Sequence, residues 1–447
     1  MGVAVPMIRP ITFFLAVVWP GLLFAQEPLT LREAIQDTLA HNRSLQGAQA
    51  GVREADAQAT QARAAYFPRI SFTEGWQRGD QPVFVFSSLL SSRQFTAANF
   101  AIDSLNQPSA TGFFRGAVSV QQMLFDGGRT SASVTSAGLQ RDVARLSADE
   151  AAAGLILAVT QVYGRVLAAT ATMKAADAAA AAAQEDLTRA TLRRDAGSLS
   201  DADVLAVAVH LSETRQRRIQ AAGDAAVAKA ELNRLMGSPI DRQYAVLEPN
   251  AAAPAPRETP SLAALFAEAE TARPDLKRAA AAEQLAEENR RQARGAWYPQ
   301  IAAQAGIEAN GTTFTDRASS WIVGGEFRWS FSTGGAENAQ QKAAVESGAR
   351  AHAAREDARA AAQVEIVTAV QQLESARARQ AVGRAAVEQA RESQRIIRDR
   401  FEAGLASTSD VLRTAAAVSD AETQRVSALV DAIVSSAMLD RALGRNP

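Results

Sequence analysis

The clearest pattern in the chain is an alternation of apolar and polar residues in four short segments. They are residues 69–78, 114–124, 300–308 and 321–330. In the first segment Ile70, Phe72 and Trp76 are apolar, while Ser71, Thr73 and Gln77 between them are polar. A period of two residues predicts β-strands with one apolar and one polar face. The sequence therefore predicts four strands, arranged as two hairpins over residues 66–125 and 298–331.

Between these segments, apolar residues recur at three- and four-residue spacing, which predicts helices. The longest predicted helix covers residues 129–196 and contains no proline; Gly197 ends it, and a second helix returns over 201–235. At about 1.5 Å per residue the first helix is a rod of roughly 100 Å. Shorter helices are predicted over 30–65 and 261–297. No compact globular domain needs a helix as long as the first one.

The same order of elements occurs twice. Leu31, Leu45, Phe67 and Pro68 have counterparts 231 residues later, at Leu262, Leu276, Tyr298 and Pro299. Gly127, Gly197, Asp203, Leu232 and Gly237 have counterparts 207 residues later, at Gly334, Gly404, Asp410, Leu439 and Gly444. The first copy thus carries 24 extra residues (231 minus 207) between Pro68 and Gly127. A repeat this long is half of one architecture rather than a solenoid unit.

The repeats define the domain organisation. The first copy covers residues 26–237 and the second covers 261–447, and a strap rich in proline and alanine joins them over 238–260. The extra residues fall in an apolar loop over residues 79–112, which includes Val83, Phe84, Val85 and Phe86. Such a loop is expected to fold onto something. Packing at the mouth of a barrel is favoured, and a constriction over the opening is the alternative.

Composition and the first residues suggest an exported protein. Residues 1–25 contain Arg9 and then an apolar run, which is typical of an export signal and is too short to span a bilayer. After residue 25 we expect no apolar run long enough for a membrane helix. The chain has no cysteine, and its formal net charge of −1 gives no reason to expect a nucleic-acid partner.

Catalytic and metal-binding patterns are not recognisable. The histidines His41, His210 and His352 lie far apart and do not show ligand spacing. The pairs Gly127-Gly128 and Gly334-Gly335 are not followed by the lysine of a phosphate-binding loop. We therefore predict no enzyme activity, no metal and no cofactor.

The four strands have the length and alternation of outer-membrane strands. A soluble sheet packed on one face would show the same alternation. However, four strands cannot close a membrane barrel, and an open sheet edge is not viable in lipid. If the strands lie in a membrane, several chains must share one barrel.

The chain from about residue 26 to its end resembles the TolC-like outer-membrane efflux channels. The resemblance rests on residues 66–68 (Tyr-Phe-Pro), 124–128 (Leu-Phe-Asp-Gly-Gly), the two glycine turns with their following Asp-Val-Leu, and the Leu-x-x-Leu-Met-Gly that ends at Gly237. It implies a mainly α fold with a small β part. Long helical hairpins would form a coiled cylinder, and four strands per chain would complete a twelve-stranded barrel in a homotrimer.

The resemblance also implies function and partners. The protein would be a passive conduit across the outer membrane and periplasm, the exit channel of a tripartite efflux or type I secretion system. Its partners would be a periplasmic adaptor, an inner-membrane pump and outer-membrane lipid. By resemblance, the adaptor would contact the two helical turns at Gly197, Ser198, Leu199, Gly404, Leu405 and Ala406.

Only some of the aperture residues that the resemblance implies are present in this chain. Asp410 matches a ring aspartate, and three copies of one carboxylate would attract cations and raise one another's pKa. Arg413 stands in place of a second ring aspartate, Ala406 in place of an arginine, and Phe401 in place of a tyrosine that could bond Asp203. One hypothesis is that Arg413 pairs with Asp410 or Asp203 across neighbouring helices. The other is that it is solvated.

A periplasmic adaptor or structural protein built from a helical hairpin is the alternative function. It explains the long helices and the export signal. It leaves the four amphipathic strands and the duplication unexplained.

Overall fold

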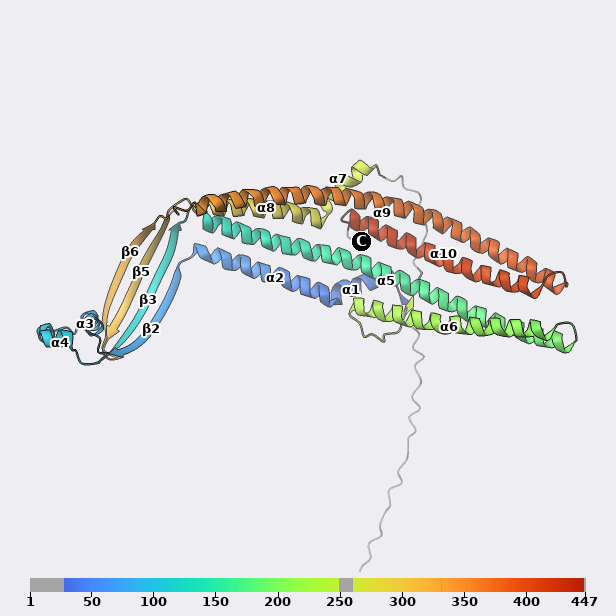
Figure 1. The fold of residues 1–447 in the computed structure, drawn as a ribbon, viewed down its shortest axis with the longest axis horizontal. Helices are drawn as coiled ribbons and strands as arrows, with labels where there is room; N and C mark the ends of the chain where they lie inside the picture. Colours follow the sequence, from blue (N-terminus) through green and yellow to red (C-terminus); the bar gives the residue numbers. More distant parts are fainter. Residues whose placement is uncertain (1–27, 249–259, 331, 446–447) are drawn as a thin grey trace, which may run out of the picture.

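The computed structural model describes residues 28–248, 260–330 and 332–445. The export segment predicted over residues 1–25 and residues 249–259 of the strap predicted over 238–260 lie outside the described residues. The described chain is elongated, with a four-stranded sheet at one end and two helical turns at the other (Figure 1).

Two long helical hairpins form most of the molecule. Helix α5 (Arg129–Asp195) pairs with α6 (Asp201–Met236), and α9 (Ala336–Glu402) pairs with α10 (Thr408–Ala442). Helices α5 and α9 each have 67 residues, or about 100 Å, as the sequence predicts. Helix α10 also packs along α5, so the half of the molecule near the turns is a curved layer in the order α9, α10, α5, α6.

The other half of the layer is completed by shorter helices that continue the lines of α6 and α10. Helix α2 (Arg43–Arg63) packs against α5, and α8 (Pro274–Gly295) lies between α5 and α9 (Figure 1). Two further helices, α1 (Leu31–His41) and α7 (Leu262–Ala272), precede them. The layer therefore has two free edges along its length, one formed by α2 and α6 and the other by α9.

The prediction of single helices over 30–65 and 261–297 is wrong. Asn42 ends α1 and begins α2 in an extended conformation, because its side chain accepts hydrogen bonds from the amides of Ser44 and Leu45. Arg273 interrupts the second helix in a similar extended conformation but without a side-chain cap, and Pro274 begins α8. A residue before proline avoids the helical conformation, so the second break was readable from the sequence.

These two breaks are equivalent positions of the two copies, and each binds the end of the long hairpin of its own copy. Asn42 Nδ2 donates to the carbonyl of Leu235 at 2.9 Å, and Arg273 Nη1 donates to the carbonyl of Ala442 at 2.9 Å. These carbonyls lie in the last turns of α6 and α10, where helix carbonyls lack intrahelical partners. The duplication thus repeats a specific joint as well as an order of elements.

The four predicted strands form one antiparallel sheet in the order β2 (Arg69–Gly79), β3 (Thr111–Phe125), β5 (Gln300–Gly311) and β6 (Ala318–Arg328). The register aligns Phe72, Val118 and Ile307 on one face, all exposed. The opposite face carries Ser71, Ser119 and Gln304 among others. Strands β2 and β6 are the unpaired edges.

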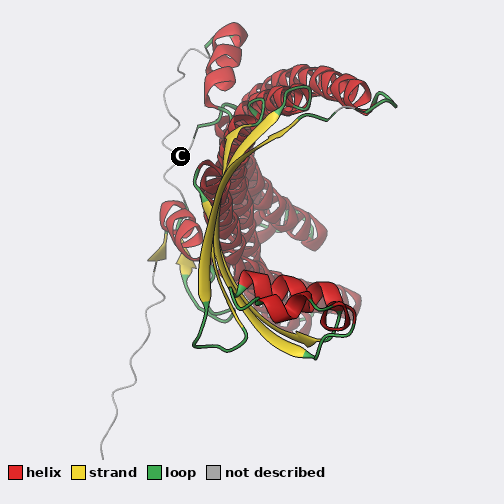
Figure 2. Ribbon diagram, turned by 90° about the vertical axis from the view of Figure 1, so that its left-hand side faces the viewer, coloured by secondary structure: helices red, strands yellow, loops and turns green. Residues whose placement is uncertain are grey.

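The insert of the first copy is folded. It contains α3 (Pro82–Ser91), a 3-10 turn (Ala97–Phe100) and α4 (Ile102–Asn106). These elements lie at the far end of the strands, and Figure 2 shows them on the concave side of the curved sheet. Phe84 of α3 meets the ring of Phe113 edge-on at 6.3 Å between centroids. Phe113 shares its face with Arg115, so the concave side is the polar face.

The main core lies where the long hairpin of the first copy meets α1. Tyr163, Val159 and Val166 of α5 are buried there, and the Tyr163 hydroxyl donates to the carbonyls of Leu29 and Leu247. These carbonyls belong to or adjoin the two short parallel strands β1 (Pro28–Leu29) and β4 (Ala245–Val246). Burial raises the pKa of Tyr163 to about 12, so this hydroxyl stays protonated and can donate.

The expectation of no membrane-length apolar run after residue 25 is wrong as stated. A window within α5 is long and apolar enough to cross a membrane by length and composition alone. Half of that window is buried within the chain, and the core helix of a soluble protein passes the same test. The core that packs around Tyr163 is sufficient to explain why this part of α5 is apolar.

Candidate functional site at the helical tip

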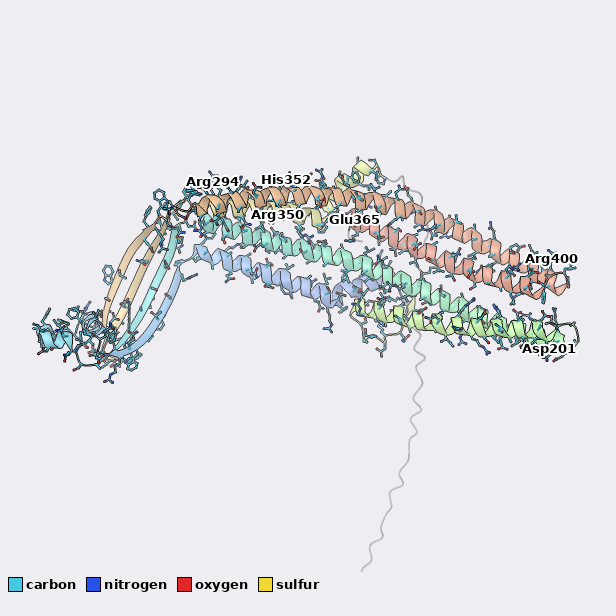
Figure 3. The ribbon with its side chains drawn as sticks, viewed as in Figure 1. Asp201, Arg294, Arg350, His352, Glu365 and Arg400 are labelled. Atoms are coloured by element: carbon cyan, nitrogen blue, oxygen red, sulfur yellow. The ribbon has the colours of Figure 1, made fainter. Side chains whose placement is uncertain are left out.

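The two helical turns lie together at the end opposite the sheet. Figure 3 marks this end with Asp201 at the start of α6 and Arg400 near the end of α9. Gly197 and Gly404 both adopt the left-handed conformation, with φ of 74° and 76°. The amide of the residue after each glycine, Ser198 or Leu405, returns to a carbonyl of the preceding helix, at 2.9 and 2.8 Å. Each turn is therefore a glycine-terminated helix end with its last carbonyls satisfied.

The residues expected to contact an adaptor form the surface of these turns. Ser198 is exposed and its hydroxyl donates to the carbonyl of Arg193 at 3.0 Å. Leu405 is largely exposed, whereas Leu199 and Ala406 are half-buried. An exposed leucine at the extreme end of an elongated molecule is a feature of a contact surface, because no described residue covers it.

The aspartates Asp203 and Asp410 have a local role that the sequence interpretation missed. Each is the third residue of its helix and forms a capping box with a serine, Ser200 or Ser407. The amide of Asp410 donates to the Ser407 hydroxyl oxygen at 3.3 Å, and the Ser407 amide donates back to Oδ2 of Asp410 at 3.1 Å. The pattern Ser-x-x-Asp precedes both helices and was a readable signal for this motif.

The capping box determines the charge state of Asp410. Hydrogen bonds from the hydroxyl and amide of Ser407 hold the pKa of this carboxyl below its ordinary value, and Arg413 and Arg400 lower it further. Within one chain, Asp410 is therefore a firmly ionised group. Repulsion among three ring carboxylates would raise the pKa of Asp410, and it would therefore oppose the lowering by Ser407 and the two arginines.

Arg413 lies beside Asp410 on the same helix. Its Nη1 is 3.5 Å from Oδ1 of Asp410, one helical turn away, and 78% of its side chain is exposed. The hypothesised bridge to a neighbouring helix is not formed in the described chain, and Asp203 is not its partner there. An exposed pair of this kind contributes little to stability.

A different contact joins the two hairpins at the tip. The guanidinium carbon of Arg193, on α5, lies 4.6 Å from the centre of the Phe401 ring on α9. This distance is within the range of a cation–π interaction. Sequence interpretation recognised Phe401 but not Arg193, because a cation–π pair between distant helices has no local pattern. We call this contact the tip clasp.

The tip clasp borders a cleft of about 140 Å³ between the hairpins. Its lining combines apolar side chains with three arginines, namely Leu199, Val207, Val411 and Leu412 with Arg189, Arg193 and Arg398 among others. Asp186 is the one acidic residue of the lining and binds Arg189 at 3.1 Å. The lining of this cleft therefore carries more basic than acidic side chains.

Over residues 28–248, 260–330 and 332–445, no group of three or more histidine or acidic side chains is placed to hold a metal ion. On the polar face of the sheet, the charged groups form pairs such as Arg115 with Glu308 and Arg328 with Glu326. This face has the character of a solvated lining.

Comparisons with known proteins agree with this geometry. A sequence model of the outer membrane efflux protein family matches residues 34–238 and 265–445, which is most of the chain and both copies. Among curated proteins, no sequence matches the chain significantly.

Several solved structures share the fold. The outer membrane protein VceC from Vibrio cholerae is 19% identical with a TM-score of 0.75, over 93% of this chain and 96% of that one. The CmeC outer membrane channel of Campylobacter jejuni is 14% identical with a TM-score of 0.78, over 93% and 85%. The open state of the MtrE outer membrane channel of Neisseria gonorrhoeae is 18% identical with a TM-score of 0.72, over 93% and 89%. At these identities the likeness concerns the fold.

Proposed function

The chain belongs to the outer membrane efflux protein family, and we propose from this that three copies form a passive conduit through the outer membrane and periplasm. As a family member it is an efflux protein of the outer membrane whose helices extend into the periplasm. The proposal adds the assembly, the gating and the partners. It describes a channel that is filled from a periplasmic adaptor and an inner-membrane pump, in a tripartite efflux or type I secretion system.

The observation that carries the proposal is the open sheet with an apolar outer face. Strands β2 and β6 leave their outer edges unpaired in the single chain. Large apolar side chains project from the convex side, including Ile70 and Phe72 on β2 and Trp321, Val323 and Phe327 on β6. A sheet of this kind can lie in lipid only if its edges are paired. Pairing β2 of one copy with β6 of the next, three times, closes twelve strands.

The helical layer, like the sheet, has two edges that nothing in the described chain covers. Exposed apolar residues lie along the two free edges, with Leu205, Val209 and Ile219 on α6 and Val364 and Val382 on α9. Monomeric soluble proteins seldom leave such rows uncovered. In a closed ring of three copies, α6 of one chain faces α9 of the next, and both rows are buried.

The tip is the natural position of a gate. There the two hairpins of one chain are joined by the tip clasp, which is worth about 0.5–1 kcal/mol at an exposed site. Breaking it would let the hairpins separate and widen the aperture. The exposed turns around Ser198 and Leu405 are the surfaces that an adaptor would reach first.

Fractionation and conductance test the proposed function together. We expect the protein in the outer-membrane fraction, and the purified protein should form ion-conducting channels in planar bilayers. Recovery in the soluble periplasm without channel activity would instead support the helical adaptor or structural protein.

A further inference from the structure

The insert of the first copy contains an apolar helix on the polar side of the sheet. Helix α3 is the most apolar short helix of the described chain, yet it lies on the concave, polar side of the sheet. The proposed conduit makes this side the lumen. An apolar helix facing a water-filled lumen is unfavourable unless another apolar surface covers it.

One side of the insert is anchored to the sheet. Phe84 packs against Phe113, and Val85 is buried. Arg93 donates from Nη2 to the carbonyl of Ser319 at 2.9 Å, which ties the end of α3 to β6. These contacts reach from β3 to β6. They fix the insert at the mouth rather than leaving it as a loose loop.

The rest of the insert has its own small core. Phe95 meets Phe86 and Phe100 edge-on, with ring centroids 4.8 and 5.0 Å apart. A short segment with an aromatic core and anchors to the sheet is a built element, and its remaining surface therefore has a defined shape.

That remaining surface is apolar and uncovered. Val83 and Ile102 are 74% and 75% exposed, and Phe100 and Leu90 are 65% and 49% exposed. We call these four residues the collar patch. Within the described chain Phe95 contacts one side of Phe100, and the exposed parts of the collar patch remain uncovered. In the proposed conduit the lipid lies on the opposite, convex side of the sheet.

The dimensions of the proposed barrel indicate what covers it. Twelve strands about 4.8 Å apart and tilted by about 40° form a mouth about 25 Å across, measured between backbones. A helix with its side chains is about 10 Å wide. Three inserts at the rim of such a mouth fill much of its area, so each meets the others.

We propose that the collar patches of three copies pack against one another and form an apolar collar that narrows the outer mouth. This inference rests on the proposed trimeric conduit. The occupant of each collar patch is thus the same patch of another copy. A hydrophobic constriction of this kind can restrict ion flow by excluding water. The conduit would then have a narrow point at each end, a charged one at the tip and an apolar one at the mouth.

Cross-linking tests the contact directly, because the natural chain has no cysteine to interfere. Single variants Val83→Cys, Leu90→Cys, Phe100→Cys and Ile102→Cys of the full chain are treated in outer membranes with a short bismaleimide. We expect covalent dimers with at least one of them. The matched control is Thr315→Cys, an exposed position on the turn between β5 and β6 at the rim of the sheet, where no dimer is expected.

A conductance measurement gives an independent readout. The double variant Val83→Ser/Ile102→Ser keeps the anchors of the insert and makes the collar polar. We expect its single-channel conductance to rise by ~twofold or more, because polar side chains let water enter the constriction. Trimers that conduct normally but neither cross-link nor respond to the double variant would overturn the collar and leave the proposed function intact. Absence of trimers would overturn the proposed function itself.

Discussion

At the scale of single residues, the tip is organised by short-range polar contacts and one aromatic contact. The carboxylates of Asp203 and Asp410 are held by the serines that begin their own helices. Arg193 is the side chain that reaches from one hairpin to the other, by stacking on Phe401. By resemblance, a latch would use a tyrosine at position 401, an arginine at 406 and a second aspartate at 413, and this chain has Phe401, Ala406 and Arg413 there. We propose that the tip clasp joins the hairpins in their place.

The tip clasp predicts how its variants will behave. Arg193→Gln and Phe401→Leu should each raise the open fraction of the channel about two- to fivefold, since the contact is worth about 0.5–1 kcal/mol. Phe401→Tyr retains the ring and should behave like the parent. Channel recordings at fixed voltage give the open fraction. The control is Arg189→Gln, a neighbouring cleft residue that pairs with Asp186; equal effects in both arginine variants would show that the clasp is not the latch.

The charge state of Asp410 predicts a pH dependence. Its pKa lies below the ordinary value of 3.8, so the stabilisation that its ionised form gives to the first turn of α10 is complete above that value. This stabilisation is lost only as the pH falls through the lower, folded-state pKa. Amide exchange at the turn before α10 should therefore show constant protection from pH 7 to about 5 and a loss below about 4. A transition between pH 5 and 7 would mean that repulsion within a ring of carboxylates dominates.

At the scale of elements, alternation and helix period are strong predictors in this chain. The four strands, the two long hairpins and their glycine turns were predicted because each depends on residues close in sequence. The breaks at Asn42 and Arg273 were missed for different reasons. Pro274 marked the second, whereas Asn42 breaks its helix through bonds that include one to Leu235, almost two hundred residues away. The sequence predicted that the insert folds onto the mouth, but not its helices or its anchors, because anchors such as Arg93 on Ser319 are also long-range.

Substitution of the residues at the two helix breaks should lower the stability of the fold. Arg273 is buried, and besides the carbonyl of Ala442 it binds Asp275 and Glu365, both at 2.7 Å. Arg273→Leu removes this partner from both carboxylates, leaving Glu365 only Arg441 at 3.5 Å, and should lower the free energy of unfolding by about 3 kcal/mol. Asn42→Ala removes a cap and a buried hydrogen bond, and should cost about 1–3 kcal/mol.

Thermal unfolding of the purified protein measures both effects. The matched control is Arg290→Ala on α8, which breaks an exposed pair with Glu287 and should change stability by well under 1 kcal/mol. Should Arg273→Leu unfold at the same temperature as this control, the role assigned to the joint would be incorrect.

At the scale of the whole molecule, one chain is a curved layer that does not close. Its two unpaired strand edges and its two exposed helix edges lie along the same pair of sides (Figure 1). The duplication makes the two halves of the layer nearly equivalent, so three chains supply six similar units around one axis. The difference between the halves is concentrated at the mouth, in the insert, and at the tip, where Arg413 has Ala206 as its counterpart.

The account depends most on closure by three copies, and the mass of the assembly tests this most directly. Native mass spectrometry of the protein extracted from outer membranes in detergent should give a single species of three chains, with no stable monomer or dimer. A monodisperse monomer that still carries the folded sheet would contradict the account, because its strand edges would then have to remain open in the membrane.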